Sequence, residues 1–222
     1  MKRKNSNIIF FDLGDTLIYR ERSHKDFDKE LIKKITGKDT DIIDNILTVM
    51  SNQDRGVYSF WIDNDRCRTI QEEEKYNKGF FVKVFNRLGC QDRLDIFIHE
   101  RNLQVRYKLF SGTLRYLKLL KESNFNLGVA TNGRPSRHIV LKQLGIYDYF
   151  CPSLVFISDE IGLTKPDKKF YLYIENKLGD LSGATLCDDE DTNLSTAVEN
   201  GWIGVKIDHN KLGFSVLDKL ID

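Results

Sequence analysis

Proline and cysteine are scarce in this 222-residue chain, which has three prolines and four cysteines. Three scattered prolines exclude a proline-rich linker. The cysteines form no Cys-x-x-Cys pair, and the four histidines show no spacing typical of metal ligands. We therefore expect free thiols and no zinc site.

Long apolar runs and an excess of one charge are also missing. The first apolar run, Ile8–Phe11, is far too short for a signal peptide or a membrane-spanning helix. The 34 basic residues balance 33 acidic ones, so no global field recruits nucleic acid or anionic lipid. We expect a cytoplasmic globular protein without nucleic-acid or membrane partners.

Five short apolar runs, rich in β-forming residues, predict strands, and helical patterns separate the last four. Glycines near the ends of these helices, among them Gly128, are interpreted as stop signals. This alternation predicts an α/β fold, with a parallel sheet covered by helices on both faces. The predicted strands are Ile8–Phe11, Leu127–Ala130, Leu154–Ile157, Thr185–Cys187 and Ile203–Ile207, and the predicted helices are Leu114–Lys121, Arg137–Leu144, Lys168–Leu178 and Leu194–Asn200.

The segment from Leu17 to Phe110 differs from the rest, because it lacks clear strands. It carries charged helical patterns, such as Glu72–Leu88 and Asp95–Phe110. We interpret it as a helical insertion. The strand before it and the strands after it must share one sheet, so we expect a discontinuous α/β core of residues 1–16 and 111–222, with a helical lobe at 17–110.

Polar residues follow most of the predicted strands. Ligands of open α/β sheets bind beyond the carboxyl ends of the strands, so these residues are the first candidates for a site. Asp12 follows the first strand, and a carboxylate there can act as a nucleophile that forms an aspartyl-phosphate. Asp12 and Asp188 would hold Mg²⁺, a cation that prefers oxygen ligands, helped by Asp189 and the Gly14 carbonyl.

The second and third strands are followed by candidates for phosphate binding. Thr131 offers a hydroxyl, and the following residues Asn132 and Gly133 offer backbone amides for the phosphate oxygens. Lys165 would neutralise both Asp12 and the phosphate. The set predicts phosphoryl transfer, which needs a nucleophile in line with the leaving group and positive charge at the transferred group.

These residues resemble a family. The segments FFDLGDTL, VATNG, GLTKPDKKF and LCDDEDTNLSTAVENGW have the order and spacing of the four motifs of haloacid dehalogenase-like hydrolases. The long gap between the first two motifs is similar to the helical cap of one subgroup. The resemblance implies a Rossmann-like core, Mg²⁺ and an aspartyl-phosphate or aspartyl-ester intermediate. It matches Asp12 to the nucleophile, Thr131 to the phosphate-binding hydroxyl, Lys165 to the motif-three lysine and Asp188 to the motif-four metal ligand.

Three positions depart from that family pattern. Most phosphatases of the family have a second aspartate two residues after the nucleophile, as acid and base, where this chain has Gly14. Asp15 is one position later and does not simply replace it, since neighbouring side chains on an extended segment point to different sides. Cys187 stands where motif four usually has glycine, and Asn193 aligns with its second acid, which makes the metal site less negative.

The function expected from the sequence is Mg²⁺-dependent removal of phosphate from a small phosphorylated metabolite, with the helical lobe as a cap. Two alternatives remain open. One is a haloacid-type dehalogenase, because halide leaves without a proton and needs no second aspartate. The other is a catalytically silent phosphate-binding scaffold. The substrate and the oligomeric state are left open.

Overall fold

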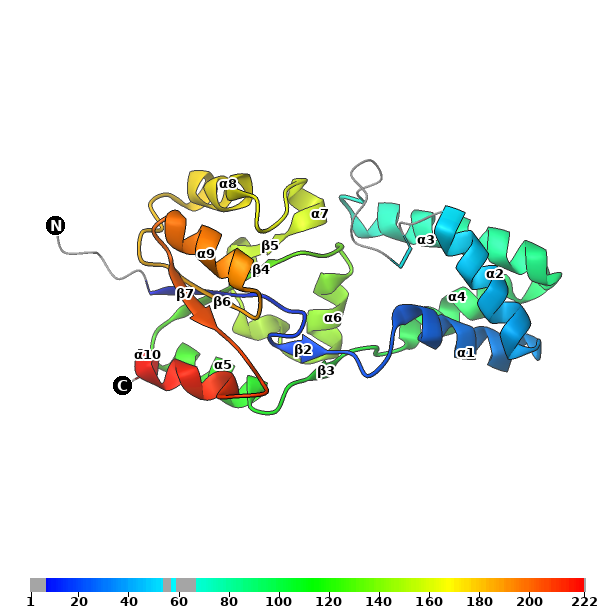
Figure 1. Ribbon diagram of the computed structural model, residues 1–222, viewed down its shortest axis with the longest axis horizontal. Coiled ribbons are helices and arrows are strands. Elements are labelled where there is room, and N and C mark those ends of the chain that lie inside the picture. The colour runs from blue at the N-terminus through cyan, green and yellow to red at the C-terminus, as the bar shows by residue number, and fades with distance from the viewer. Residues whose placement is uncertain (1–6, 54–56, 59–66, 222) are drawn as a thin grey trace. The chain divides into compact units, whose positions relative to one another are not determined.

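The structure, a computed structural model, describes residues 7–53, 57–58 and 67–221 (Figure 1). The chain forms two compact units, one made of residues 1–19 with 107–222 and the other of residues 20–106. The second unit begins at residue 20 rather than 17 and ends at 106 rather than 110. The reason is a short antiparallel ribbon of β2 (Ile18–Tyr19) and β3 (Lys108–Leu109), which belongs to the first unit.

The first unit contains the expected parallel sheet, in the order β5-β4-β1-β6-β7. The α/β, Rossmann-like fold class is therefore confirmed. Within the sheet, Phe11 is opposite Val129 on one side and Cys187 on the other, so the carboxyl ends of β1, β4 and β6 lie within two residues of one another. The strands are β1 (Ile8–Phe11), β4 (Asn126–Thr131), β5 (Val155–Ile157), β6 (Thr185–Asp188) and β7 (Ile203–Lys206).

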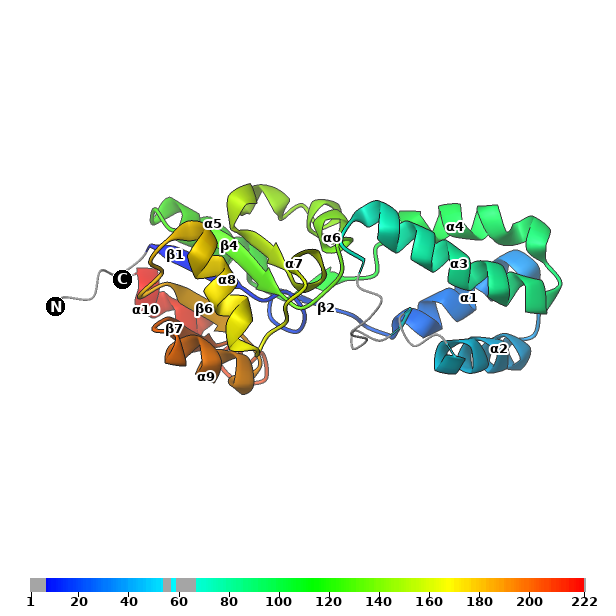
Figure 2. The same ribbon diagram turned by 90° about the horizontal axis from the view of Figure 1, so that it is seen from above.

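Helices cover both faces of this sheet. Ile9 and Phe11 point to the face of α5, α6 and the C-terminal segment, whereas Phe10 points to the face of α8 and α9 and stacks on Trp202. In Figure 1, α8 and α9 lie above the sheet and α5 and α10 below it; Figure 2 views it from the α8 and α9 side. The helices are α5 (Thr113–Glu122), α6 (Arg137–Gln143), η2 (Tyr147–Tyr149), η3 (Pro152–Leu154), α7 (Ser158–Ile161), α8 (Lys168–Leu178), α9 (Asp191–Glu199), η4 (Gly213–Leu217) and α10 (Asp218–Ile221).

Gly128 does not mark the end of a helix, so this interpretation was wrong. It lies inside β4, and α5 ends earlier, at Glu122. A Cβ on Gly128 would lie 2.7 Å from the ring of Phe10 and 2.7 Å from the carbonyl oxygen of Leu154. The glycine therefore permits a close approach of neighbouring groups to the strand.

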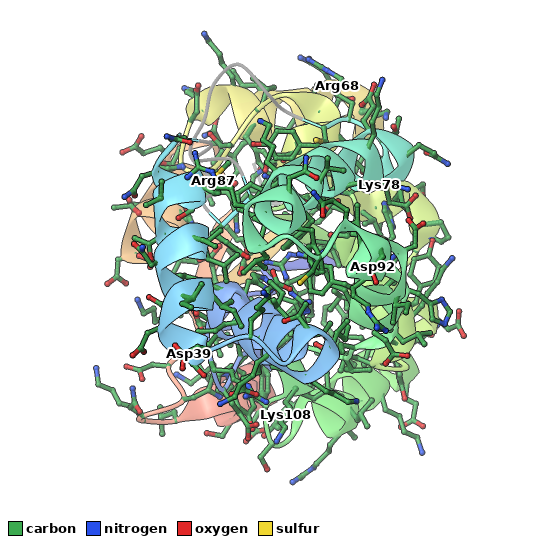
Figure 3. The ribbon with its side chains drawn as sticks, turned by 90° about the vertical axis from the view of Figure 1, so that its right-hand side faces the viewer. Asp39, Arg68, Lys78, Arg87, Asp92 and Lys108 are labelled. Carbon is green, nitrogen blue, oxygen red and sulfur yellow. The ribbon has the colours of Figure 1, made fainter. Side chains whose placement is uncertain are left out.

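The second unit is a group of helices with its own core, centred on Phe81, Phe85 and Phe97. The helix expected over Asp95–Phe110 ends at Leu103, because the chain then enters the β3 ribbon. The helices are α1 (His24–Thr36), α2 (Thr40–Gln53), α3 (Ile70–Leu88), η1 (Gln91–Arg93) and α4 (Leu94–Leu103). Figure 3 labels exposed charged residues of this unit, among them Asp39, Lys78 and Asp92.

Among the described residues, no helix combines the length and the apolar character needed to cross a membrane. All four cysteines are free thiols, as expected.

A buried ionic cluster joins α1 to the end of the helical unit. The Asp28 carboxylate is fully buried and accepts hydrogen bonds from Arg101 at 2.9 Å, Arg106 at 2.7 Å and the Tyr58 hydroxyl at 3.0 Å. Burial opposes its ionisation, but the two guanidinium groups outweigh that effect and lower the pKa of Asp28. The carboxylate therefore stays charged and ties distant segments together.

We predict that Asp28→Asn lowers the free energy of unfolding by about 3–5 kcal/mol, because the buried Arg106 and the partly buried Arg101 lose their counter-ion. Urea denaturation followed by circular dichroism measures this loss. Asp44→Asn is the matched control, since Asp44 pairs with Lys25 and Lys29 but its side chain is 42% exposed; its loss should be about 0–1 kcal/mol. Equal losses in the two variants would show that the Asp28 cluster is not a main support of the helical unit.

Candidate active site

The site begins with Asp12, the first residue after β1. Its backbone N–H donates to the carbonyl oxygen of Cys187 at 2.9 Å, which continues the pairing with β6 beyond the end of the strand. The carboxylate is therefore fixed between β4 and β6, at the carboxyl edge of the sheet. Asp12 is buried despite its charge.

A lysine ammonium group bridges the two acidic strand ends. The Nζ atom of Lys165 lies 2.8 Å from Oδ1 of Asp12 and 2.5 Å from Oδ2 of Asp188, the last residue of β6. The lysine side chain is 1% exposed. The structure thus brings together three of the predicted site residues. Lys165 is 153 positions from Asp12 and 23 positions from Asp188 in the sequence.

Asn132 holds the backbone of this lysine. Its amide group donates to the Lys165 carbonyl oxygen and its oxygen accepts from the Lys165 N–H, both at 2.9 Å. The side chain that we expected beside a phosphate-binding amide thus fixes the loop between α7 and α8. Its neighbour Thr131 is the buried last residue of β4, the strand beside β1.

Burial and charge act on this cluster in opposite directions. Burial raises the pKa of Asp12 to about 6, since lost hydration and the nearby Asp188 charge outweigh the attraction of Lys165. For Lys165, burial favours the neutral amine, but Asp12 and Asp188 outweigh it and raise the pKa, so the ammonium persists. Two carboxylates share one ammonium, so the cluster carries one net negative charge.

Three donors surround the Asp188 carboxylate. Besides Lys165, the Glu190 N–H donates to Oδ1 at 2.8 Å, and the Asn193 amide lies 3.0 Å from Oδ1 and 3.1 Å from Oδ2. The Tyr171 hydroxyl donates to the carbonyl oxygen of Asn193 at 2.8 Å and steadies this residue. Asn193 therefore donates a hydrogen bond to Asp188. An aspartate at position 193 would repel that carboxylate instead.

The oxygen atoms available here suit a hard cation. Mg²⁺ in proteins usually takes one or two carboxylates and completes its shell with waters and a phosphate oxygen. Asp12 and Asp188 supply two carboxylates. Together with Lys165 they carry one net negative charge, which would attract a cation. In the part of the chain that the structure describes, no three His, Cys, Asp or Glu side chains form a metal-binding group. The role of the Gly14 carbonyl as a metal ligand stays a prediction.

Asp189, the other expected ligand, is tied to the turn after β1. Its Oδ1 accepts a hydrogen bond from the hydroxyl of Thr16 at 3.0 Å. Burial raises the pKa of Asp189, and this hydrogen bond offsets only part of the effect. Its role as a metal ligand stays a prediction.

The turn after β1 leaves space beside Gly14. A Cβ built on Gly14 meets no atom within 4 Å, and its backbone is outside the positive-φ region. Asp15 has a φ of 56° and an exposed side chain. A side chain can therefore begin at position 14 without a clash at its Cβ.

Ser158 is a residue of the site region that the sequence analysis missed. Its hydroxyl accepts from the Gly133 N–H at 3.0 Å and donates to the Gly133 carbonyl oxygen at 3.2 Å. This N–H, which we expected to bind phosphate, therefore already has a protein partner. Ser158 directly follows β5, so the rule that polar residues follow strands would have found it.

Comparisons with known proteins identify the family of this chain. The family model of haloacid dehalogenase-like hydrolases matches residues 7–189. The chain therefore belongs to the haloacid dehalogenase-like hydrolases. A search of curated proteins found no match.

Solved structures share the fold at low sequence identity. A predicted HAD-like family hydrolase from Porphyromonas gingivalis has a TM-score of 0.60 at 16% identity, with 98% of each chain covered. A HAD phosphatase from Thermococcus onnurineus has a TM-score of 0.59 at 20% identity, covering 92% of this chain and 87% of its own. A 2-haloacid dehalogenase from Pseudomonas syringae pv. Tomato DC3000 has a TM-score of 0.58 at 18% identity, covering 91% and 86%. The neighbours thus include both phosphatases and dehalogenases.

Proposed function

We propose that this hydrolase removes phosphate from a small organic phosphate, with Mg²⁺ as its cofactor and Asp12 as its nucleophile. The observation that carries the proposal is the buried Lys165 ammonium between Asp12 and Asp188. A nucleophile, a fixed positive charge and a second carboxylate at one sheet edge are the parts that phosphoryl transfer requires. The phosphatase among the similar structures supports the same choice.

In the first step, an oxygen of Asp12 attacks phosphorus, and the bond between phosphorus and the ester oxygen breaks. Lys165 holds the Asp12 carboxylate in place and supplies positive charge for the transferred group. The Thr131 hydroxyl, at the end of the neighbouring strand, donates to a phosphate oxygen. Asp12, Asp188 and the Gly14 carbonyl would hold Mg²⁺, which would supply positive charge against the phosphate.

In the second step, water attacks phosphorus of the aspartyl-phosphate, and Asp12 is released as the carboxylate. A general base would accelerate this step, just as a general acid would assist the departing alkoxide in the first. Gly14 occupies the position of that residue and can do neither. The proposed enzyme therefore works best on esters with good leaving groups.

We assign the helical unit, residues 20–106, the role of a cap that selects the substrate. The support for this role is the path of the chain. It leaves the core through β2, next to the turn of residues 13–18 that follows Asp12 (the catalytic turn), and it returns through β3, which pairs with β2. A cap of this kind excludes water from the reaction.

A dehalogenase is the second candidate, because Gly14 suits a leaving group that needs no proton and a 2-haloacid dehalogenase shares the fold. The reactions differ in released product and metal requirement. Purified protein is therefore incubated with diverse phosphate esters and with 2-chloropropionate, each with MgCl₂ or with EDTA. Magnesium-dependent phosphate release supports our proposal, whereas chloride release that EDTA does not reduce would establish the dehalogenase.

We predict that Asp12→Asn abolishes phosphate release, because an amide cannot form the covalent intermediate, and that the variant stays folded, because Asp188 still pairs with Lys165. Asp15→Asn is the matched control, since Asp15 is exposed and asparagine tolerates its positive φ. It should retain wild-type kcat. If Asp12→Asn keeps kcat within about tenfold of wild type, a barrier change of only about 1.4 kcal/mol, Asp12 is not the nucleophile.

We predict that Mg²⁺ binding depends on Asp188 and is limited by Asn193. Asp188→Ala should remove the heat of Mg²⁺ binding in calorimetry. Asn193→Asp should tighten binding about tenfold, which equals about 1.4 kcal/mol, because it adds a negative charge and removes a donor from Asp188. Asp180→Ala, an exposed acid before β6, is the control. Unchanged binding in Asp188→Ala would place the cation elsewhere.

We predict that Gly14→Asp increases kcat/KM for alkyl phosphates by about 10²–10⁴-fold, the usual contribution of a general acid. The open space around the glycine Cβ position allows this substitution without strain. Aryl phosphates, whose leaving groups need less protonation, should gain less. Gly14→Asn is the control of nearly equal size. No gain for alkyl phosphates would show that another residue already transfers the proton.

A further inference from the structure

The turn after β1 carries Gly14 and Thr16 and is held only partly by its own backbone. The N–H groups of Leu17 and Ile18 both donate to the carbonyl oxygen of Leu13 at 2.9 Å, and the Asp15 N–H donates to the Ile18 carbonyl oxygen at 2.8 Å. The positive φ of Asp15 departs from ordinary helical or strand geometry. Contacts from other segments add to these bonds and help to hold the turn beside Asp12.

One such contact comes from His209, which lies in the loop after β7. Its Nε2 atom is 2.8 Å from the carbonyl oxygen of Thr16. A carbonyl oxygen only accepts hydrogen bonds, so Nε2 carries the proton. Thr16 is fully buried, and its hydroxyl donates to Asp189. His209 thus fixes the backbone of Thr16, whose side chain contacts Asp189 in the loop after β6.

The orientation of the His209 ring is set by its neighbours. The ring stacks on Phe110 at a centroid distance of 3.6 Å and an interplanar angle of 10°, and it meets Phe214 edge-on at 5.0 Å. These contacts aim Nε2 at Thr16.

Phe110 connects the same ring to the ribbon that leads into and out of residues 20–106. It directly follows β3, and its N–H donates to the Leu17 carbonyl oxygen at 3.1 Å. Its ring lies 4.8 Å from that of Tyr19 in β2. The ribbon and the catalytic turn therefore meet at His209.

We propose that His209 is a positioning residue for the hydrolysis, which holds the catalytic turn through its hydrogen bond to Thr16 and is itself aimed by Phe110. This inference rests on the function proposed above. A turn held in this way keeps Gly14 and Thr16 in register with Asp12, and misplacement by about 1 Å can lower a rate by about 10²-fold.

Two substitutions separate the hydrogen bond from the ring. His209→Phe keeps a ring for stacking and loses the donor, whereas His209→Gln places an amide N–H near the former Nε2 and loses the ring. We expect His209→Phe to lower kcat at least about tenfold with KM within about threefold, because the turn acts on the reacting groups. His209→Gln should keep kcat within about threefold of wild type. Melting temperatures verify folding.

Hydrogen exchange measured by mass spectrometry tests the same point without substrate. Amides in the segment 13–18 should exchange faster in His209→Phe and at the wild-type rate in His209→Gln. If His209→Phe does not fold, Phe110→Leu removes the stacking partner and keeps the donor, and exchange in the same segment should still become faster.

The inference is overturned if exchange in segment 13–18 is unchanged in His209→Phe, or if His209→Gln is as impaired as His209→Phe. Unchanged exchange in Phe110→Leu overturns it when the phenylalanine variant does not fold. A wild-type protein that releases no phosphate refutes the proposed function instead, and the exchange experiment still decides the role of His209.

Discussion

The buried ammonium group of Lys165 is the constraint on which the rest of the structure depends. A charged amine without water is costly unless it is paired and hydrogen-bonded. Its partners are Asp12, which follows β1, and Asp188, which ends β6. These two strands are neighbours in the sheet, so their carboxyl ends lie side by side. Other features of the site hold the groups of this contact in place. The Asn132 side chain fixes the backbone of Lys165, and the donors around Asp188 fix its carboxylate.

Most of the core fold could be predicted from the sequence, because its strands are apolar runs separated by amphipathic helices. The strand Ile8–Phe11 and the helix Lys168–Leu178 have the predicted bounds. The predictions failed where one pattern has two structural meanings. The charged pattern over Asp95–Phe110 predicts one continuous helix, but α4 ends at Leu103 and β3 follows. A two-residue strand is too short to show an alternating pattern of its own. Gly128 permits close packing within a strand and does not end a helix.

The site was predictable where chemistry follows a strand end, and less so where a contact joins remote segments. Asp12, Lys165 and Asp188 form one hydrogen-bonded cluster, as the motifs indicate. Ser158 directly follows β5 but lies outside the segment GLTKPDKKF that forms motif three, so the motif does not indicate it. His209 is different, since it contacts the backbone of a residue 193 positions away. No composition or spacing in one sequence reveals a side chain that binds a distant carbonyl group.

Gly14 and Asn193 both occupy positions where related phosphatases carry acids, and their effects on charge have the same sign. Asp12, Asp188 and Lys165 together carry one net negative charge, whereas two further aspartates would make it three. For the proposed phosphatase, a dianionic substrate therefore meets less repulsion before a cation binds. The same change removes the group that would transfer protons and weakens the attraction for Mg²⁺. In the proposed phosphatase, the site would thus favour holding the phosphate over protonating its leaving group, and esters that leave as stable anions would be its best substrates.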